Sequence, residues 1–132
     1  MKTAVLSRWR TNAPLEDTRS EAGHITVHVI HAGDHITVAV AGRVTVDSSP
    51  DLRSTLLDLL RREAAPVIHI ELSGVSYLDT SGLATLLEAL KAAHGRSVIL
   101  RVTGISGASR TLAEIAQLDT IFREWGSQVE FR

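Results

Sequence analysis

The sequence predicts a single α/β domain built on a mixed sheet of four to five strands, and three observations support this fold class. Two early segments alternate strictly between polar and apolar residues, and the turn-forming triplet Ala32-Gly33-Asp34 separates them. Segments with leucines at helical spacing then alternate with short runs rich in Val and Ile. This order favours an opening antiparallel hairpin followed by parallel strands, with helices packed mainly on one face.

The two alternating segments define the hairpin. The first begins at His24, and Gly42 ends the second. A period of two places one set of side chains toward the core. We expect that set to be Ile25, Val27, Val29, Ile36, Val38 and Val40.

The run Ser48-Ser49-Pro50-Asp51 predicts the start of the first helix. Serine can cap a helix, proline fits its first turn, and an acidic residue complements its positive end. The helix should end before Pro66. Its buried face should consist of Leu52, Leu56, Leu59 and Leu60.

The second half of the chain continues the alternation. We expect a central strand over residues 67–72, a turn at Ser73-Gly74, and a second helix from about Thr80 to Gly95. Further predictions are a strand over residues 97–102, a loop over 103–109, and an edge strand over 129–131. A single third helix between them should bury Leu112, Ile115, Ala116 and Leu118.

Residues 1–22 differ from the rest of the chain because no apolar period persists there. We therefore divide the chain into an N-terminal arm, residues 1–22, and one domain, residues 23–132. A flexible arm is the simpler interpretation. A partner-docking segment or a short added helix is the alternative.

Composition excludes several classes of function. There is no cysteine, which excludes disulfides, thiolate catalysis and cysteine-ligated zinc. A formal net charge of -1 argues against general nucleic-acid binding, which needs a basic face. No apolar run reaches the roughly 20 residues that a membrane helix needs. We therefore expect a cytoplasmic protein without a membrane span.

The run Asp79-Thr80-Ser81-Gly82 is the candidate site. Asp79 or Thr80 can cap the second helix, and the positive end of that helix also favours an anion. A phosphate on Ser81 would add about 1.5 to 2 negative charges there, which the helix would tolerate. Residue types alone do not distinguish this site from an ordinary helix cap.

A longer stretch of sequence distinguishes a phosphorylation site from an ordinary helix cap. The run Asp79-Thr80-Ser81-Gly82-Leu83, preceded by Leu72-Ser73-Gly74-Val75-Ser76-Tyr77-Leu78, resembles the signature of the STAS domain, a family that includes the bacterial anti-sigma factor antagonists. The resemblance extends over about residues 24–125. It implies a regulatory binding protein with no catalytic residue, cofactor or metal.

The resemblance also implies partners and site residues. In such antagonists the serine before the glycine is phosphorylated by the anti-sigma factor, itself a serine kinase, and a serine phosphatase reverses this. The unphosphorylated antagonist binds the kinase and frees the sigma factor. Ser81 would be the phosphoacceptor, with Thr80 as second choice. The implied partner-binding residues are Asp79, Thr80, Ser81, Gly82, Thr45 and Asp47.

One segment departs from the family pattern. Antagonists of this kind usually carry an acidic residue where Arg43 stands and an aspartate where Thr45 stands, while Asp47 lies two residues further on. The alternative function is therefore a non-switching adaptor or scaffold, as in stressosome-like assemblies or a lipid-transport ATPase complex. The sequence leaves self-association open.

Other candidate sites are weaker. The histidines near the hairpin, His24, His28, His31 and His35, are interpreted as solvent-facing rather than as metal ligands. The segment from Gly104 to Gly107 precedes a helix but lacks the lysine of a P-loop. An enzyme or nucleotide-binding protein therefore ranks last among the hypotheses.

Overall fold

The computed structural model describes residues 18–19, 25–62 and 65–132. The expected N-terminal arm lies outside the described residues except for its Thr18–Arg19 segment, and the domain boundary stays a prediction. The elements in chain order are β1 (Thr18–Arg19), β2 (Ile25–Ala32), β3 (His35–Val44), α1 (Ser49–Arg62), β4 (Val67–Leu78), α2 (Thr80–Gly95), β5 (Ile99–Ile105), α3 (Gly107–Ile115), α4 (Leu118–Glu124) and β6 (Gln128–Phe131).

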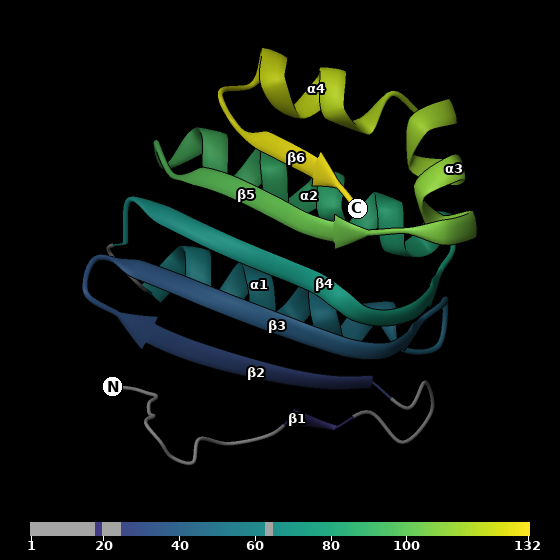
Figure 1. Ribbon diagram of the computed structural model, residues 1–132. Helices are drawn as coiled ribbons and strands as arrows, with labels where there is room; N and C mark the ends of the chain where they lie inside the picture. Colours follow the sequence, from purple (N-terminus) through teal and green to yellow (C-terminus); the bar gives the residue numbers. More distant parts are fainter. Residues whose placement is uncertain (1–17, 20–24, 63–64) are drawn as a thin grey trace.

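All strands belong to one sheet, whose spatial order β1-β2-β3-β4-β5-β6 follows the sequence (Figure 1). Strands β2 and β3 form the expected antiparallel hairpin, and β3, β4, β5 and β6 are parallel. The mixed sheet, the hairpin and the closing edge strand are thus confirmed, although β3 continues past Gly42, where the second segment was expected to end, to Val44. The two-residue strand β1 adds a short antiparallel edge beside β2.

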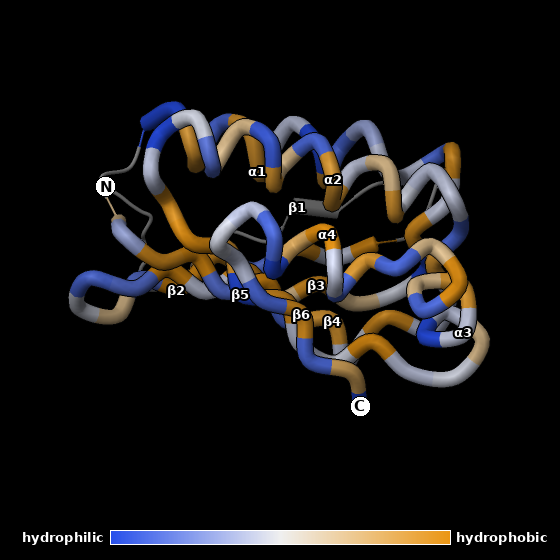
Figure 2. Tube along the Cα trace, turned by 90° about the horizontal axis from the view of Figure 1, so that it is seen from above, coloured by the Kyte–Doolittle hydropathy of each residue, from blue (hydrophilic) through white to orange (hydrophobic). Residues whose placement is uncertain are grey.

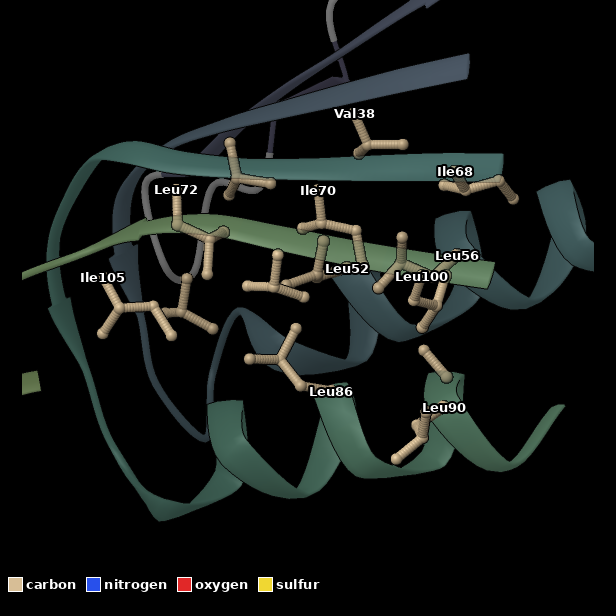
Figure 3. Close-up of a cluster of buried hydrophobic side chains, with 14 of the residues drawn as sticks. Val38, Leu52, Leu56, Ile68, Ile70, Leu72, Leu86, Leu90, Leu100 and Ile105 are labelled. Carbon is tan, nitrogen blue, oxygen red and sulfur yellow. The ribbon is translucent and has the colours of Figure 1, made fainter. Parts of the chain in front are cut away.

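The helices α1 and α2 lie side by side on one face of the sheet (Figure 2). Between them and the strands lies one core, in which the leucines of both helices meet the Val, Ile and Leu side chains of the sheet (Figure 3). The expected inner residues Leu52, Leu56 and Leu60 are fully buried, whereas Leu59 is half-buried. Helix α4 lies beside the edge strand β6.

Strand β4 is longer than predicted, because it continues through the expected turn at Ser73-Gly74 to Leu78. A Cβ at Gly74 would lie 3.0 Å from the Cβ of Ala41 and 3.2 Å from the carbonyl oxygen of Val40. Glycine therefore lets β4 approach β3 closely, where the register between the two strands shifts. The extension carries the chain directly to the candidate site.

Strand β5 also differs from its predicted bounds. It begins at Ile99 rather than at residue 97 and includes Gly104, which was expected in a loop. Gly104 has a φ of +91°, and a Cβ there would lie 2.4 Å from the backbone nitrogen of Ser73. The glycine thus serves a bulge in close contact with β4 rather than a turn.

The predicted third helix is wrong as a single element. Gln117, with a φ of +57°, separates α3 from α4. As a result Ile115 is 76% exposed and Ala116 is exposed, although both were expected inside, whereas Leu118 is fully buried. A left-handed residue turns the chain and gives the two helices different buried faces.

Among the residues that the structure describes, no helix is long and apolar enough to cross a membrane.

The contact at Gly104 predicts a large loss of stability for Gly104→Ala. A positive φ costs a non-glycine residue about 1–2 kcal/mol. The clash with Ser73 should lower the free energy of unfolding by about another 1–3 kcal/mol. The matched control is Gly107→Ala, because Gly107 has a φ of +61° with no atom within 4 Å of a built Cβ. Equal losses for both variants in urea unfolding would contradict the clash.

Candidate functional site

The candidate site lies where β4 ends and α2 begins. Asp79 is the N-cap of α2, with extended backbone angles, and its carboxylate accepts the backbone N–H groups of Ser81 (2.9 Å) and Gly82 (3.2 Å). The same oxygen, Oδ1, accepts the hydroxyl of Ser81. Three donors on two residues therefore converge on one carboxylate oxygen. This arrangement fixes both the start of the helix and the orientation of the Ser81 hydroxyl.

These hydrogen bonds determine the charge state of the cap. Burial raises the pKa of Asp79, but hydrogen bonds outweigh it and bring the pKa below the usual value for aspartate. They come from the Ser81 hydroxyl and from the backbone N–H groups of Gly82, Ser81 and Val46. Asp79 is consequently ionised at neutral pH. The contribution of Val46 shows that the carboxylate also faces the loop between β3 and α1.

Gly82 is buried and sets how closely α2 approaches the sheet. A Cβ there would lie 2.8 Å from Cγ of Leu78 and 3.0 Å from Cγ1 of Val44. Any side chain at this position would push the first turn of α2 away from the ends of β3 and β4. Gly82 is therefore a packing residue, and its side of the helix is closed to a partner.

The loop between β3 and α1 lies next to this cap. Ser48 is fully buried, and its hydroxyl accepts the N–H of Thr45 (2.9 Å) and donates to the carbonyl of Arg43 (2.7 Å). The hydroxyl of Thr45 accepts the N–H of Asp47 at 3.3 Å. Because the Asp79 N–H also donates to the Val44 carbonyl (3.1 Å), loop and cap form one connected unit.

Two exposed apolar side chains border the same unit. Val46 is 69% exposed at the tip of the loop, and Tyr77 is 40% exposed near the end of β4. The guanidinium of Arg43 lies over the Tyr77 ring, 4.6 Å from its centroid. This combination of aromatic, cationic and apolar side chains is typical of protein-binding surfaces. We name Arg43, Val46, Tyr77, Thr80 and Ser81 the switch surface.

The structure brings together most of the residues predicted from sequence. Ser81 and Asp79 are half-buried, and Thr80 is exposed beside them. Thr45 and Asp47 lie in the adjoining loop, with Asp47 exposed. Gly82 is present but faces the core.

Sequence reasoning missed Val46, Tyr77 and Ser48 as parts of this region. An apolar residue between Thr45 and Asp47 was the available signal for Val46. The buried position of Ser48 depends on the folded loop, and no sequence signal indicated it.

The weaker candidates gain no support from the described part of the chain. It contains no group of three or more His, Cys, Asp or Glu side chains that could hold a metal ion. Gly107 is the first residue of α3, and the N-cap Ser106 makes no side-chain capping hydrogen bond. A cavity of about 440 Å³ between α4 and β6 is lined by Asp119, Arg123 and Glu130, among others, and holds none of the predicted site residues.

The cap geometry predicts that Asp79→Ala lowers the free energy of unfolding at neutral pH by about 0.5–2 kcal/mol. The pKa of Asp79 in the folded protein lies below its unfolded value of about 3.9. Its contribution is therefore complete above that value and is lost as the pH falls through the folded pKa. The variant should lose less stability on acidification than the parent. Urea unfolding across the acid range measures this, with Asp47→Ala as the exposed control. Parallel pH profiles for the parent and Asp79→Ala would contradict the assignment.

Comparison with known proteins places this geometry in context. A family model described as "Mlab, STAS domain" matches residues 27–124. An anti-sigma-B factor antagonist of Staphylococcus epidermidis is 30% identical over 108 residues, which cover 81% of this chain and 99% of that protein. Another, from Listeria monocytogenes, is 32% identical over 88 residues, or 67% of this chain and 76% of that protein.

Solved structures show the same fold. An anti-sigma factor antagonist from Mycobacterium paratuberculosis has a TM-score of 0.69 at 22% identity, covering 80% of this chain and 87% of its own. The phosphorylated form of the Bacillus protein SpoIIAA has a TM-score of 0.61 at 11% identity, covering 80% of this chain and 90% of its own. The family model spans most of the described domain and includes the Asp79 cap. The chain therefore belongs to the STAS domain family.

Proposed function

We propose that this chain is an anti-sigma factor antagonist, a regulatory binding protein switched by phosphorylation of Ser81. The observation that carries the proposal is the position of the Ser81 hydroxyl. It is half-buried, is held by the Asp79 carboxylate, and lies in the first turn of a helix whose cap is also next to the backbone of the exposed Val46. A phosphate on Ser81 would therefore add negative charge close to an exposed loop, where we propose that the partner docks.

Phosphorylation at this position has two opposing effects. The N-terminus of α2 favours negative charge, so the helix tolerates a phosphate. The Ser81 hydroxyl, however, no longer donates to Asp79, and a dianion then lies beside an ionised carboxylate. Repulsion between the two turns the phosphate toward the partner, which would have to desolvate it on docking. The fold is retained while the complex is weakened.

The comparisons support the same function. The curated relatives are named anti-sigma-B factor antagonists and include one that this chain matches over 99% of its length. Structures of SpoIIAA, an anti-sigma factor antagonist, exist for the unphosphorylated and the phosphorylated form. For this chain we therefore propose an anti-sigma factor with serine kinase activity and a serine phosphatase as partners, in the cytoplasm.

The site fits a substrate of phosphorylation better than an enzyme. The Ser81 hydroxyl donates to the Asp79 carboxylate. Serine nucleophiles of acyl-transfer enzymes are activated by an adjacent general base that accepts their proton. A carboxylate with a lowered pKa is a weak base. We propose that the kinase supplies the catalytic groups and that this chain supplies the acceptor.

Variants of Ser81 test the switch. With the anti-sigma factor of the same organism, Ser81→Ala should keep its affinity and accept no phosphate, as intact-mass analysis would show. Ser81→Asp should bind at least tenfold more weakly, about 1.4 kcal/mol, because a fixed charge occupies the surface. Thr80→Ala is the matched control and should still accept one phosphate. Equal affinities of Ser81→Ala and Ser81→Asp would contradict the proposal.

Tyr77 tests the extent of the switch surface. Tyr77→Ala should weaken the complex by about 2 kcal/mol, roughly 30-fold, because a central aromatic residue is a typical interface hot spot. Its effect on the free energy of unfolding should be about 1 kcal/mol, because the ring is 40% exposed and loses mainly its contact with Arg43. Ile115→Ala removes an exposed apolar side chain on α3 and is the control. Calorimetric titration that finds equal affinity for both variants would place the interface elsewhere.

A second candidate function is a non-switching subunit of a transporter complex. The family model carries the description Mlab, and a sulfate transporter family protein of Wolinella succinogenes shares the fold with a TM-score of 0.62 at 19% identity. Arg43 and Thr45, which stand where antagonists usually carry acidic residues, also favour it. Recovery of a transporter ATPase with the tagged protein, and no phosphate on Ser81 in cells, would select this function.

A further inference from the structure

The end of β4 is held from both sides before the chain enters α2. On one side β3 supplies the partner, because the N–H of Asp79 donates to the carbonyl of Val44 at 3.1 Å. On the other side the pairing of β4 with β5 ends at Glu71 and Thr103, whereas β4 continues to Leu78. The backbone N–H groups on that side of the last part of β4 therefore need acceptors from another element.

Helix α3 supplies one of these acceptors. It lies at the end of the sheet where β4 passes into α2 (Figure 1). The hydroxyl of Ser109 accepts the N–H of Leu78 at 3.0 Å, although the two residues are 31 positions apart in the sequence. Ser109 is 8% exposed and Leu78 is 2% exposed. Loss of the hydroxyl would therefore leave a buried N–H group without this acceptor, and the end of β4 would have to shift to satisfy it.

The same hydrogen bond connects α3 with the sheet. Two residues of α3, Ser109 and Ala113, are buried. Ala113 contributes apolar contact to the core, whereas Ser109 provides a directional bond to the backbone of β4. The position of α3 and the position of the last residue of β4 are therefore linked.

Leu78 transmits this link to the candidate site in two ways. Along the chain, the next residue is Asp79, whose carboxylate holds the hydroxyl of Ser81 and the N–H groups of Ser81 and Gly82. Through space, the side chain of Leu78 packs under the first turn of α2, because a Cβ at Gly82 would lie 2.8 Å from its Cγ. A shift of Leu78 would consequently move both the cap and the turn that carries Ser81.

We propose that Ser109 is a positioning residue for the phosphorylation of Ser81, because by holding the N–H of Leu78 it fixes the Asp79 cap in the orientation that presents the Ser81 hydroxyl to the kinase. This inference rests on the proposed function, since it assigns a further residue to the same site. Ser109 acts through Leu78 and Asp79 and does not contact the acceptor hydroxyl itself.

Ser127 offers a matched control for Ser109. Its hydroxyl accepts the N–H of Leu100 at 2.9 Å, and both residues are buried. Leu100 lies near the beginning of β5, at the end of the sheet away from the first turn of α2. Ser127→Ala therefore removes the same kind of buried hydrogen bond without altering the end of β4.

Two measurements on Ser109→Ala and Ser127→Ala test the proposal. Amide hydrogen exchange followed by NMR should be faster than in the parent at Ser81 and Gly82 in Ser109→Ala. With the anti-sigma factor of the same organism, kcat for phosphorylation of this variant should fall about tenfold, because a misplaced acceptor reacts slowly. Its KM should stay within about twofold of the parent value, since the switch surface is unaltered. Ser127→Ala should leave exchange at the cap and kcat unchanged.

Several outcomes would overturn the proposal. Equal losses of kcat in the two variants would show that phosphorylation responds only to overall stability. Parental kcat and parental exchange in Ser109→Ala would show that the hydrogen bond positions nothing. If Ser109→Ala fails to fold by circular dichroism, Ser109→Cys fills the site with a weak acceptor and should give the results expected for alanine; parental values in that variant would overturn the proposal.

The exchange measurement separates this proposal from the proposed function. A parent protein that accepts no phosphate from the kinase would refute the proposed function. Exchange at Ser81 and Gly82 needs no kinase and would then decide the link between Ser109 and the cap by itself. Faster exchange in Ser109→Ala would support the link, and unchanged exchange would refute it.

Discussion

The carboxylate of Asp79 is the constraint on which the rest of the site depends. One oxygen accepts the Ser81 hydroxyl and two backbone N–H groups, and the Val46 backbone lies close enough to lower the pKa of the same group. The start of α2, the orientation of the hydroxyl and the position of the neighbouring loop are therefore coupled. Gly82 makes this possible because it allows the helix to lie directly on Val44 and Leu78.

The coupling gives the proposed switch a physical basis. A phosphate on Ser81 would remove one donor from Asp79 and add a second anion next to it, while the backbone donors stay in place. The Asp79 carboxylate would then divide its remaining hydrogen bonds differently between α2 and the loop that carries Val46. Surface charge and loop position would change together, although the core beneath them would not. A small domain can respond to one modification in this way without a rearrangement of its sheet.

Local signals predicted the part of the structure that local interactions determine. The hairpin follows from alternation between Ile25 and Val40, and the cap follows from the residue types of Asp79-Thr80-Ser81-Gly82. The errors arise where distant segments meet. The length of β4 depends on Gly74 against Ala41, and the bulge at Gly104 depends on the backbone of Ser73. The break at Gln117 reverses the expected burial of Ile115, and the exposure of Val46 and Tyr77 is likewise a property of the folded chain.

The sequential order of the sheet has a consequence for how the chain forms on the ribosome. Each strand from β2 onward pairs with the strand synthesised immediately before it. At about 5–20 residues per second, a newly emerged strand finds its partner already outside the exit tunnel. No strand has to wait for a later segment to be inserted between it and its neighbour. The domain can therefore assemble from its first hairpin outward, in the order in which translation delivers its parts.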